Sequence, residues 1–431
     1  MTLLVKVVQA INTEHTSINV GTRNIVIHTG LILHAENSDA LVGVIAHETG
    51  HIEGGNRVRT QEALKDASAI QMIGAIIGTA AGVAAKRSDV GSAVIMGSQG
   101  AGARTFFQYS RTQESAADQA AMRLLDATER SGKGLQKFLG GLEGQMLLSD
   151  RFRDPYMRSH PLSRERIDAL ARHNESSPYA DTPRPESELL LYDRMVAKLY
   201  GFIEPLRNVL RRYPETDTSF AARYARAVAY YRVPELARAL GIVDELLGEA
   251  PRDAFLFELK GQMLFENGRV AEAYEAYREA FRLAPTEPLI AMELARVELE
   301  LNDPGRLDSA IEHFRLALRL GENTSFLWRQ LGIAYGRQGN IAMSSLALAE
   351  AELRIGQLAN AELQATRARD TLEKGTSAHL QALDILQSIH QFLLMKPALT
   401  GVIYFLLFSY NQSSVNFSEY HIHRTDDSNH I

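Results

Sequence analysis

Apolar residues recur at helical spacing near the start of the chain. Leu41, Val44 and Ile45 stand at relative positions 0, 3 and 4, as on one buried face of a helix. A serine–aspartate pair before this run supplies a candidate N-cap, and two glycines after it supply a candidate stop. We therefore predict an amphipathic helix over residues 39–53.

A short β-prone run precedes this helix. Asn24 to Thr29 is rich in β-branched residues and is flanked by Gly21 and Gly30, so the pattern predicts a strand. His28 falls on the face of this strand opposite to Ile27, and we interpret it as structural rather than as a metal ligand.

The second half of the chain repeats itself. Pro251 and Pro285 stand 34 residues apart, the period of paired antiparallel helices. Large and small residues alternate between them as such a pair requires, at Phe257, Gly261, Leu264, Gly268, Ala273, Tyr277 and Ala280. A weaker unit precedes this one, and two follow before the array ends over residues 363–389. The unit after Pro285 carries extra residues around Pro304, which predicts a longer turn.

An uncharged stretch lies between the predicted helix and the repeats. Residues 67–85 contain no charged side chain in 19 positions, but they are rich in glycine and alanine. One interpretation is a buried helical hairpin that continues through residues 90–103. Another is a mobile helix that touches a membrane or gates a cleft, so that residues 67–103 make peripheral membrane contact. A true membrane span is the least favoured.

Composition shifts mark the predicted domain boundaries. We expect a first domain over 1–173, a linker rich in proline and serine over 174–188, a repeat domain over 189–390 and a tail over 391–431. The tail opens with an apolar, β-prone run over 397–408, too short to span a bilayer. Histidines further along the tail, His421, His423 and His430, are at most weak metal ligands.

Charge and cysteine content narrow the function classes. The 431 residues carry a net charge of −6 with no basic stripe, which argues against a nucleic-acid partner. The chain has no cysteine, which excludes disulfides and thiol chemistry and is compatible with an oxidising compartment. The N-terminal residues lack the basic region and cleavage site of a signal peptide.

The strongest chemical signal is His47-Glu48-Thr49-Gly50-His51. Histidines four apart on a helix share one face, so both imidazoles can bind the same metal ion. A zinc ion held in this way activates a water molecule, and Glu48 is placed to act as the general base that accepts its proton. The motif therefore predicts a zinc hydrolase with one Zn²⁺ per chain.

A catalytic zinc site needs a third protein ligand. Without cysteine, that ligand is a histidine, an aspartate or a glutamate. We select Glu114, on a predicted helix with Asp118 one turn further on. Asp118 would lie behind a ligating histidine and hold its other ring nitrogen. Small residues around this pair, chiefly alanine, would let the helix approach another closely.

These motifs together resemble a known family. The His-Glu-Thr-Gly-His motif with Ser-Arg-x-x-Glu-x-x-Ala-Asp downstream resembles gluzincin metallopeptidases of the HtpX and CAAX-prenyl-protease type, and more closely their periplasmic BepA-like branch with C-terminal tetratricopeptide repeats. The resemblance covers roughly residues 20–390. It implies an α+β zincin-type domain, mostly helical with a small sheet, followed by an α-helical tetratricopeptide solenoid.

The resemblance also assigns roles to individual residues. It implies that Glu114 is the third ligand, that His160 before Pro161 closes over the zinc as a fourth ligand and switch, and that Arg166 holds substrate or the developing oxyanion. The spacing leaves open whether His160 is an inhibitory latch or an oxyanion stabiliser. A histidine before proline is also common in surface turns, so a purely structural His160 is the alternative.

Further expectations concern the substrate and the chain ends. In zincins the strand beside the active-site helix binds extended substrate by strand addition, which we expect of residues 24–29. Relatives in the resembling family carry a signal, a helix and a strand before this point, so we expect a periplasmic protein with a truncated N-terminus.

Two functions follow as hypotheses. The first is a zinc endopeptidase of the bacterial envelope in quality control of outer-membrane protein assembly, whose repeats dock protein substrates or the assembly machinery. The alternative is a repeat-based chaperone or scaffold with a latched or inactive metal site. The intact Glu48 favours the enzyme, because a scaffold has no need of a general base.

Overall fold

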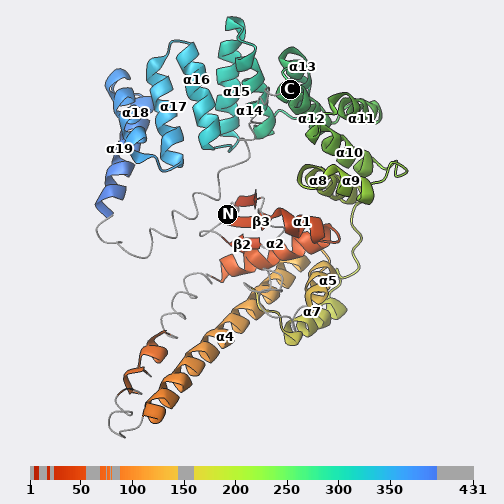
Figure 1. Cartoon of the computed structure of the whole chain (residues 1–431), viewed down its shortest axis with the longest axis vertical. Coiled ribbons are helices and arrows are strands. Elements are labelled where there is room, and N and C mark those ends of the chain that lie inside the picture. Colours follow the sequence, from red (N-terminus) through yellow and green to blue (C-terminus); the bar gives the residue numbers. More distant parts are fainter. Residues whose placement is uncertain are drawn as a thin grey trace, which may run out of the picture. The chain divides into compact units, whose positions relative to one another are not determined.

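The protein folds as a small α+β unit followed by a helical solenoid, which confirms the predicted fold class (Figure 1). The computed structural model describes residues 4–8, 17–19, 24–54, 68–73, 75–77, 79, 88–143 and 160–395. The chain divides into two compact units, Met1–Arg226 and Ala227–Ile431.

The predicted strand is the centre of a three-stranded sheet. β3 (Asn24–His28) pairs in parallel with β1 (Leu4–Val8) and antiparallel with β2 (Ser17–Asn19). Its buried Ile25 and Ile27 point into the core. Because β3 has a partner on both sides, the prediction that substrate adds to this strand is wrong; the sheet edges among the described strands belong to β1 and β2.

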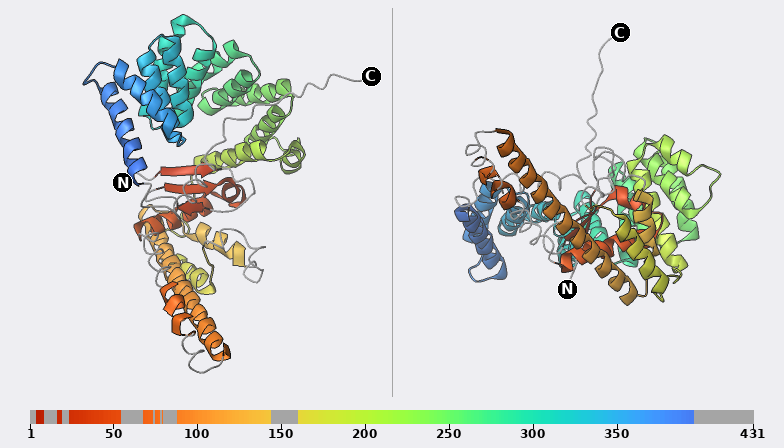
Figure 2. Two further views of the ribbon diagram at one scale, coloured as in Figure 1. Left: turned by 60° about the vertical axis from the view of Figure 1, so that its left-hand side comes forward. Right: turned by 90° about the horizontal axis from the view of Figure 1, so that it is seen from below.

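The helix with the histidine motif is α2 (Ser38–Glu53), which follows the short α1 (Thr29–His34). Its N-cap is Asn37, whose side chain accepts a hydrogen bond from the Ala40 amide at 3.0 Å. The prediction of a cap one or two residues later was wrong, because the extended backbone of Asn37 gives its carboxamide that geometry. Figure 2 shows the strands lying against α2.

Glycines bring the neighbouring helices close to α2. At Gly50, a Cβ would lie 2.8 Å from the Ala117 carbonyl oxygen and 2.9 Å from Ala120 Cβ of α4 (Ser88–Ala127). At Gly43, a Cβ would lie 2.7 Å from Leu135 Cβ of α5 (Lys133–Leu142). The small residues predicted on the second metal helix thus serve a close α2–α4 contact.

The first unit extends beyond the predicted linker. α7 (Arg164–Ser176) and α8 (Glu186–Ile203) both belong to it, so the observed division differs from the predicted start of the repeats at residue 189. The buried Tyr192 of α8 donates hydrogen bonds to the carbonyls of Ile32 and Ala35 at 3.1 and 2.9 Å. These contacts join α8 to the core of the first unit.

The predicted linker itself is anchored. Arg184 pairs with Asp39 at 2.6 Å, and Arg130 forms a two-pronged pair with Glu188 at 3.0 and 2.9 Å. Proline and serine content made residues 174–188 resemble a tether, but their charged side chains fix the segment to the start of α2 and to the turn between α4 and α5. α9 (Leu206–Arg212) follows α8.

The uncharged segment does not form the expected buried hairpin, as far as it is described. Residues 68–73, 75–77 and 79 are helical. Their large apolar side chains are exposed, at 65% for Met72, 56% for Ile73, 65% for Ile76 and 54% for Ile77, as is Met96 of α4 at 72%. Within the described ranges, no helix combines the length and apolar character needed to cross a membrane.

The repeats of the second unit are paired helices, as the period predicted. They are α10 (Phe220–Arg232), which crosses the division, α11 (Leu236–Glu249), α12 (Ala254–Glu266), α13 (Val270–Leu283), α14 (Pro288–Glu300), α15 (Leu307–Arg319), α16 (Ser325–Arg337), α17 (Ile341–Arg354), α18 (Leu358–Thr371) and α19 (Ser377–Met395). A Cβ at Gly261 would lie 2.6 Å from the Tyr277 ring, so this glycine lets α12 and α13 pack. The extra residues form a 3₁₀ turn over Pro304–Arg306.

The predicted tail starts too early. α19 continues through residues 391–395, which belong to the last helix. The apolar run over 397–408 and the histidines at 421, 423 and 430 lie outside the described residues.

Candidate metal centre

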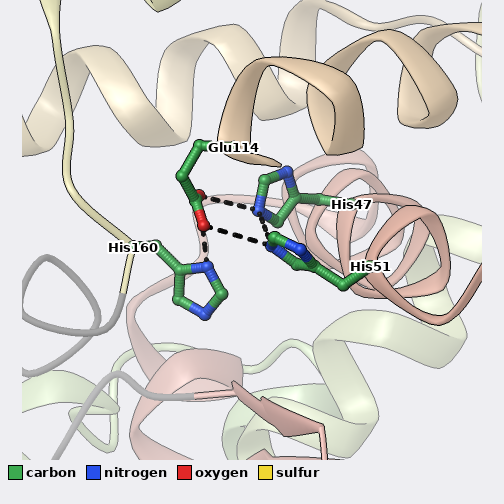
Figure 3. A group of neighbouring side chains, drawn as sticks. All are labelled: His47, His51, Glu114 and His160. Atoms are coloured by element: carbon green, nitrogen blue, oxygen red, sulfur yellow. Dashed lines mark hydrogen bonds and ion pairs between the residues drawn. The ribbon is translucent and has the colours of Figure 1, made fainter. Parts of the chain in front are cut away.

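Four side chains from three parts of the first unit converge on one point (Figure 3). His47 and His51 project from α2, Glu114 from α4, and His160 from the segment that leads into α7. One ligand atom from each residue lies within 4.8 Å of the others. The structure therefore brings together the predicted ligands and the predicted fourth histidine.

The carboxylate of Glu114 is the hub of this group. Its Oε2 lies 3.3 Å from His47 Nε2 and 3.3 Å from His160 Nδ1, and its Oε1 lies 3.3 Å from His51 Nε2. The two Nε2 atoms of His47 and His51 face each other at 3.1 Å. All four side chains thus present nitrogen or oxygen to a common centre.

The donor set suits a metal ion. Two ring nitrogens facing each other at 3.1 Å repel unless a proton or a cation lies between them. Two imidazoles and a carboxylate are the ligand types of catalytic zinc sites, in which a further position stays open. His160 would hold that further position, so the residues present fit a bound metal.

Burial and neighbouring charges set the protonation of the ligands. Burial lowers the pKa of His47, but hydrogen bonds with Asp118 and Glu114 outweigh this effect and raise the pKa to about 9. Burial lowers the pKa of His51. Burial raises the pKa of Glu114, but the adjacent histidines, His160 foremost, hold it well below its usual range. Glu114 is therefore an anion, as a metal ligand must be.

Asp118 lies behind the ligands, as predicted from its spacing. Its Oδ1 lies 2.9 Å from His47 Nδ1, the ring nitrogen that faces away from the group. Burial raises the pKa of Asp118, but hydrogen bonds from Arg166 and His47 outweigh burial, so the net pKa lies below its ordinary value. A carboxylate in this position orients a ligating imidazole and selects its tautomer.

Glu48 lies beside the group without being part of it. The side chain is fully buried, and Oε1 lies 3.4 Å from His160 Nε2. His28, expected to be structural, is outside the four-residue group. Within the motif, Glu48 thus stands apart from the two histidines of the group, in a position where a buried carboxylate can act as a base.

Arg166 enters the centre from α7. It contacts Asp118, Glu114 and the carbonyl of Pro161. The spacing pattern gave no signal for the Pro161 contact, because a backbone carbonyl is available at every residue and only the loop conformation selects one.

Two family models match the chain. Residues 15–174 match peptidase family M48, and residues 258–323 match a tetratricopeptide repeat. The first match contains all four members of the group, and the second falls within the second unit.

Two curated relatives align with most of this chain. The beta-barrel assembly-enhancing protease of Yersinia pestis is 23% identical over 348 residues, covering 78% of this chain and 69% of that protein. The protein of the same name from Escherichia coli (strain K12) is 21% identical over 363 residues, covering 79% and 73%. The solved structure of pilF from Pseudomonas aeruginosa is 21% identical, covers 51% of this chain and 98% of its own, and has a TM-score of 0.34.

The M48 match and the His/Glu group together indicate a metallopeptidase that uses a metal ion. The repeats indicate a protein or peptide partner.

Proposed function

We propose that this chain, which combines a peptidase M48 domain with tetratricopeptide repeats, is a zinc-dependent endopeptidase of the bacterial cell envelope. The observation that carries the proposal is the convergence of His47, His51 and Glu114 on one point with Glu48 beside them. This is the division between ligands and base that peptide hydrolysis needs.

Each residue has a distinct role in this proposal. His47, His51 and Glu114 would hold the zinc, and Asp118 holds the Nδ1 proton of His47, so that Nε2 is the nitrogen that would bind the metal in place of its proton. The zinc supplies Lewis-acid activation of a water molecule and of the substrate carbonyl. Glu48 accepts the proton of the attacking water on its carboxylate and delivers it to the leaving amine.

His160 lies between Glu114 and Glu48. Its Nδ1 contacts Glu114, and its Nε2 faces Glu48, so it occupies the space between ligand and base. We propose that it acts as a latch: a substrate or water must displace it before Glu48 can work.

Zinc analysis and proteolysis test the assignment. We expect one zinc per purified chain, loss of that zinc in His47→Ala and Glu114→Ala, and full zinc without cleavage of casein in Glu48→Gln. His173→Ala is the matched control, because this histidine pairs with Asp126 on the outside of the group. Cleavage by Glu48→Gln at the wild-type rate would refute the mechanism.

The physiological setting is a proposal from the relatives. The two relatives described above are named for enhancing beta-barrel assembly. We propose that this chain works in the periplasm in quality control of outer-membrane proteins, with the repeats docking substrates or the assembly machinery. Crosslinking in envelope extracts would test it; capture that survives deletion of the repeats would contradict the docking role.

A non-enzymatic scaffold is the alternative function. Glu48→Gln separates the two, because this change replaces the proposed base with a neutral side chain of the same shape. If the variant restores envelope integrity to a strain lacking the protein as well as the wild type does, then binding rather than cleavage is the function.

Exposed apolar side chains support membrane contact through residues 67–103. Ile73, Ile76 and Met96 are all more than half exposed. Apolar side chains of this kind enter the interfacial region of a bilayer. In a flotation assay we expect the wild type to bind vesicles and Ile73→Ser/Ile76→Ser to bind less; equal binding by both would refute the contact.

A further inference from the structure

One buried cation joins three parts of the metal centre. Arg166, in the first turn of α7, is 4% exposed. Its Nε and Nη2 donate to the two oxygens of Asp118 at 2.6 and 2.8 Å. Its Nη1 lies 3.0 Å from Glu114 Oε2 and donates to the Pro161 carbonyl at 2.9 Å. The guanidinium therefore reaches a ligand, the residue behind a ligand, and the loop that carries His160.

The shape of this contact is specific to arginine. The planar guanidinium matches both oxygens of one carboxylate at once, which fixes the rotation of Asp118 as well as its position. Asp118 in turn fixes the ring of His47 through Nδ1. Removing one of the two hydrogen bonds between Arg166 and Asp118 would allow the Asp118 carboxylate to rotate, and the His47 ring would rotate with it.

The same side chain is tied to the latch loop. Pro161 follows His160 directly, and Ser163 caps α7 by accepting the Arg166 amide at 3.4 Å on its hydroxyl and 3.1 Å on its carbonyl. Arg166 is therefore bonded to the loop through its backbone and through Nη1. A displacement of the loop that withdraws His160 from Glu114 would move the Pro161 carbonyl relative to Arg166.

We propose that Arg166 is a positioning residue that couples the His160 latch to the metal ligands. The inference rests on the proposed metal site. In this inference, Arg166 holds Asp118, Glu114 and the Pro161 carbonyl in fixed relative positions. The position of His160 and the geometry of the metal ligands therefore change together. This role differs from the expectation that Arg166 holds substrate or the oxyanion, because Nε, Nη1 and Nη2 all contact acceptors of the protein itself.

Zinc affinity in a double-mutant cycle tests the coupling. Arg166→Lys keeps the charge and loses the two-pronged contact. We expect it to weaken zinc binding, measured by chelator competition, by about 10- to 100-fold, the range typical for residues behind a metal ligand. His160→Ala is then added in both backgrounds. If Arg166 positions His160, the loss of zinc affinity caused by His160→Ala should be at least about threefold smaller in Arg166→Lys than in the wild type.

A matched control and a second variant keep the test decisive. Arg164→Lys alters an exposed arginine of the same helical turn, paired with Glu143, and should leave zinc affinity unchanged. If circular dichroism shows Arg166→Lys to be unfolded, Asp118→Asn replaces it in the cycle, since it weakens the same pair from the other side. Asp118→Asn should weaken zinc binding, and it should make the loss of zinc affinity caused by His160→Ala smaller than in the wild type.

The contrary outcomes separate the inference from the proposed function. The coupling is overturned if Arg166→Lys binds zinc as tightly as the wild type and His160→Ala lowers zinc affinity equally in both backgrounds. If kcat of Arg166→Lys also falls by about 10²- to 10³-fold, Arg166 is assigned to the oxyanion instead. In either case the zinc peptidase stands. A wild-type chain that binds no zinc overturns the proposed function, and the inference with it.

Discussion

At the residue scale, two of the proposed ligands are also held by contacts outside the group of four. His47 meets Glu114 on one ring nitrogen and Asp118 on the other, and Glu114 meets Arg166 as well as the histidines. Such contacts hold the ligands near one geometry before the metal arrives, which reduces the entropy lost when it binds.

The latch is tested at its own residue. We expect His160→Ala to raise cleavage of a short peptide, because the imidazole lies between Glu114 and Glu48, where substrate and water must enter. Initial rates at saturating zinc measure the effect, since the variant also loses a metal contact. A fall of about 10²- to 10³-fold would instead mark His160 as an oxyanion donor, and an unchanged rate would reject both roles.

Gly50 tests whether the motif also serves packing. Gly50→Ala places a methyl group 2.8 Å from the Ala117 carbonyl oxygen, so α2 and α4 must separate. We expect the metal-free chain to lose about 1–3 kcal/mol of stability, as for other overpacked sites. Gly140→Ala in α5 is the control, since a Cβ there meets nothing within 4 Å. It should be neutral or stabilising by roughly 0.5–1 kcal/mol. Equal thermal unfolding of the two variants would contradict this packing role.

The spacing of residues predicted more of the centre than of its surroundings. Helix periodicity places His47 with His51, and Glu114 with Asp118, on shared helix faces. The family resemblance implied that Glu114 joins the two histidines, and the structure brings these side chains together. The N-cap and the Pro161 contact were missed because both depend on the conformation of a single loop residue, and many sequences are compatible with each conformation.

At the scale of elements, α8 shows where composition misleads. Residues 174–188 carry the prolines and serines of a tether, yet Arg184 and Glu188 pair with residues of the first unit. Composition describes the average behaviour of a segment. Here, a few long-range ion pairs and the buried Tyr192 determine that residues 174–188 and α8 pack on the first unit. The repeats were easier to predict, because their period recurs several times and each hairpin contacts its neighbour in sequence.

Tyr192 tests the place of α8 in the first unit. Burial raises the pKa of its hydroxyl to about 12, so it remains a donor to the carbonyls of Ile32 and Ala35. Tyr192→Phe leaves those buried acceptors without this donor, and we expect a loss of about 1–3 kcal/mol in thermal unfolding of the peptidase unit.

Truncations extend the same test. A chain that ends at Glu188, the last residue of the predicted linker, lacks Tyr192 and Val196 and should not fold. A chain that ends at Arg232 keeps α8 to α10 and should fold and bind zinc. A folded, zinc-binding product from the shorter chain would show that α8 is dispensable to the core.

At the scale of the whole molecule, the metal-ligating group and the matched repeat lie in different units. Within the described part of the chain, the group of four metal-ligating side chains lies in the first unit. The second unit consists of paired helices, whose stacking offers a partner surface rather than a reaction centre. The proposed function therefore assigns substrate capture to the second unit and cleavage to the first.

The chain that ends at Arg232 tests this division of labour. It should cleave a short unfolded peptide with kcat/KM close to that of the full chain, because His47, Glu48, His51, Glu114 and His160 are all retained. Its affinity for a large unfolded outer-membrane protein should fall by about 10²-fold, the loss expected when one of two linked binding modules is removed. Fluorescence anisotropy with Glu48→Gln in both lengths measures binding without cleavage. Equal affinity of the two lengths would place substrate capture in the peptidase unit, and loss of short-peptide cleavage would show that the repeats are needed to build the active site.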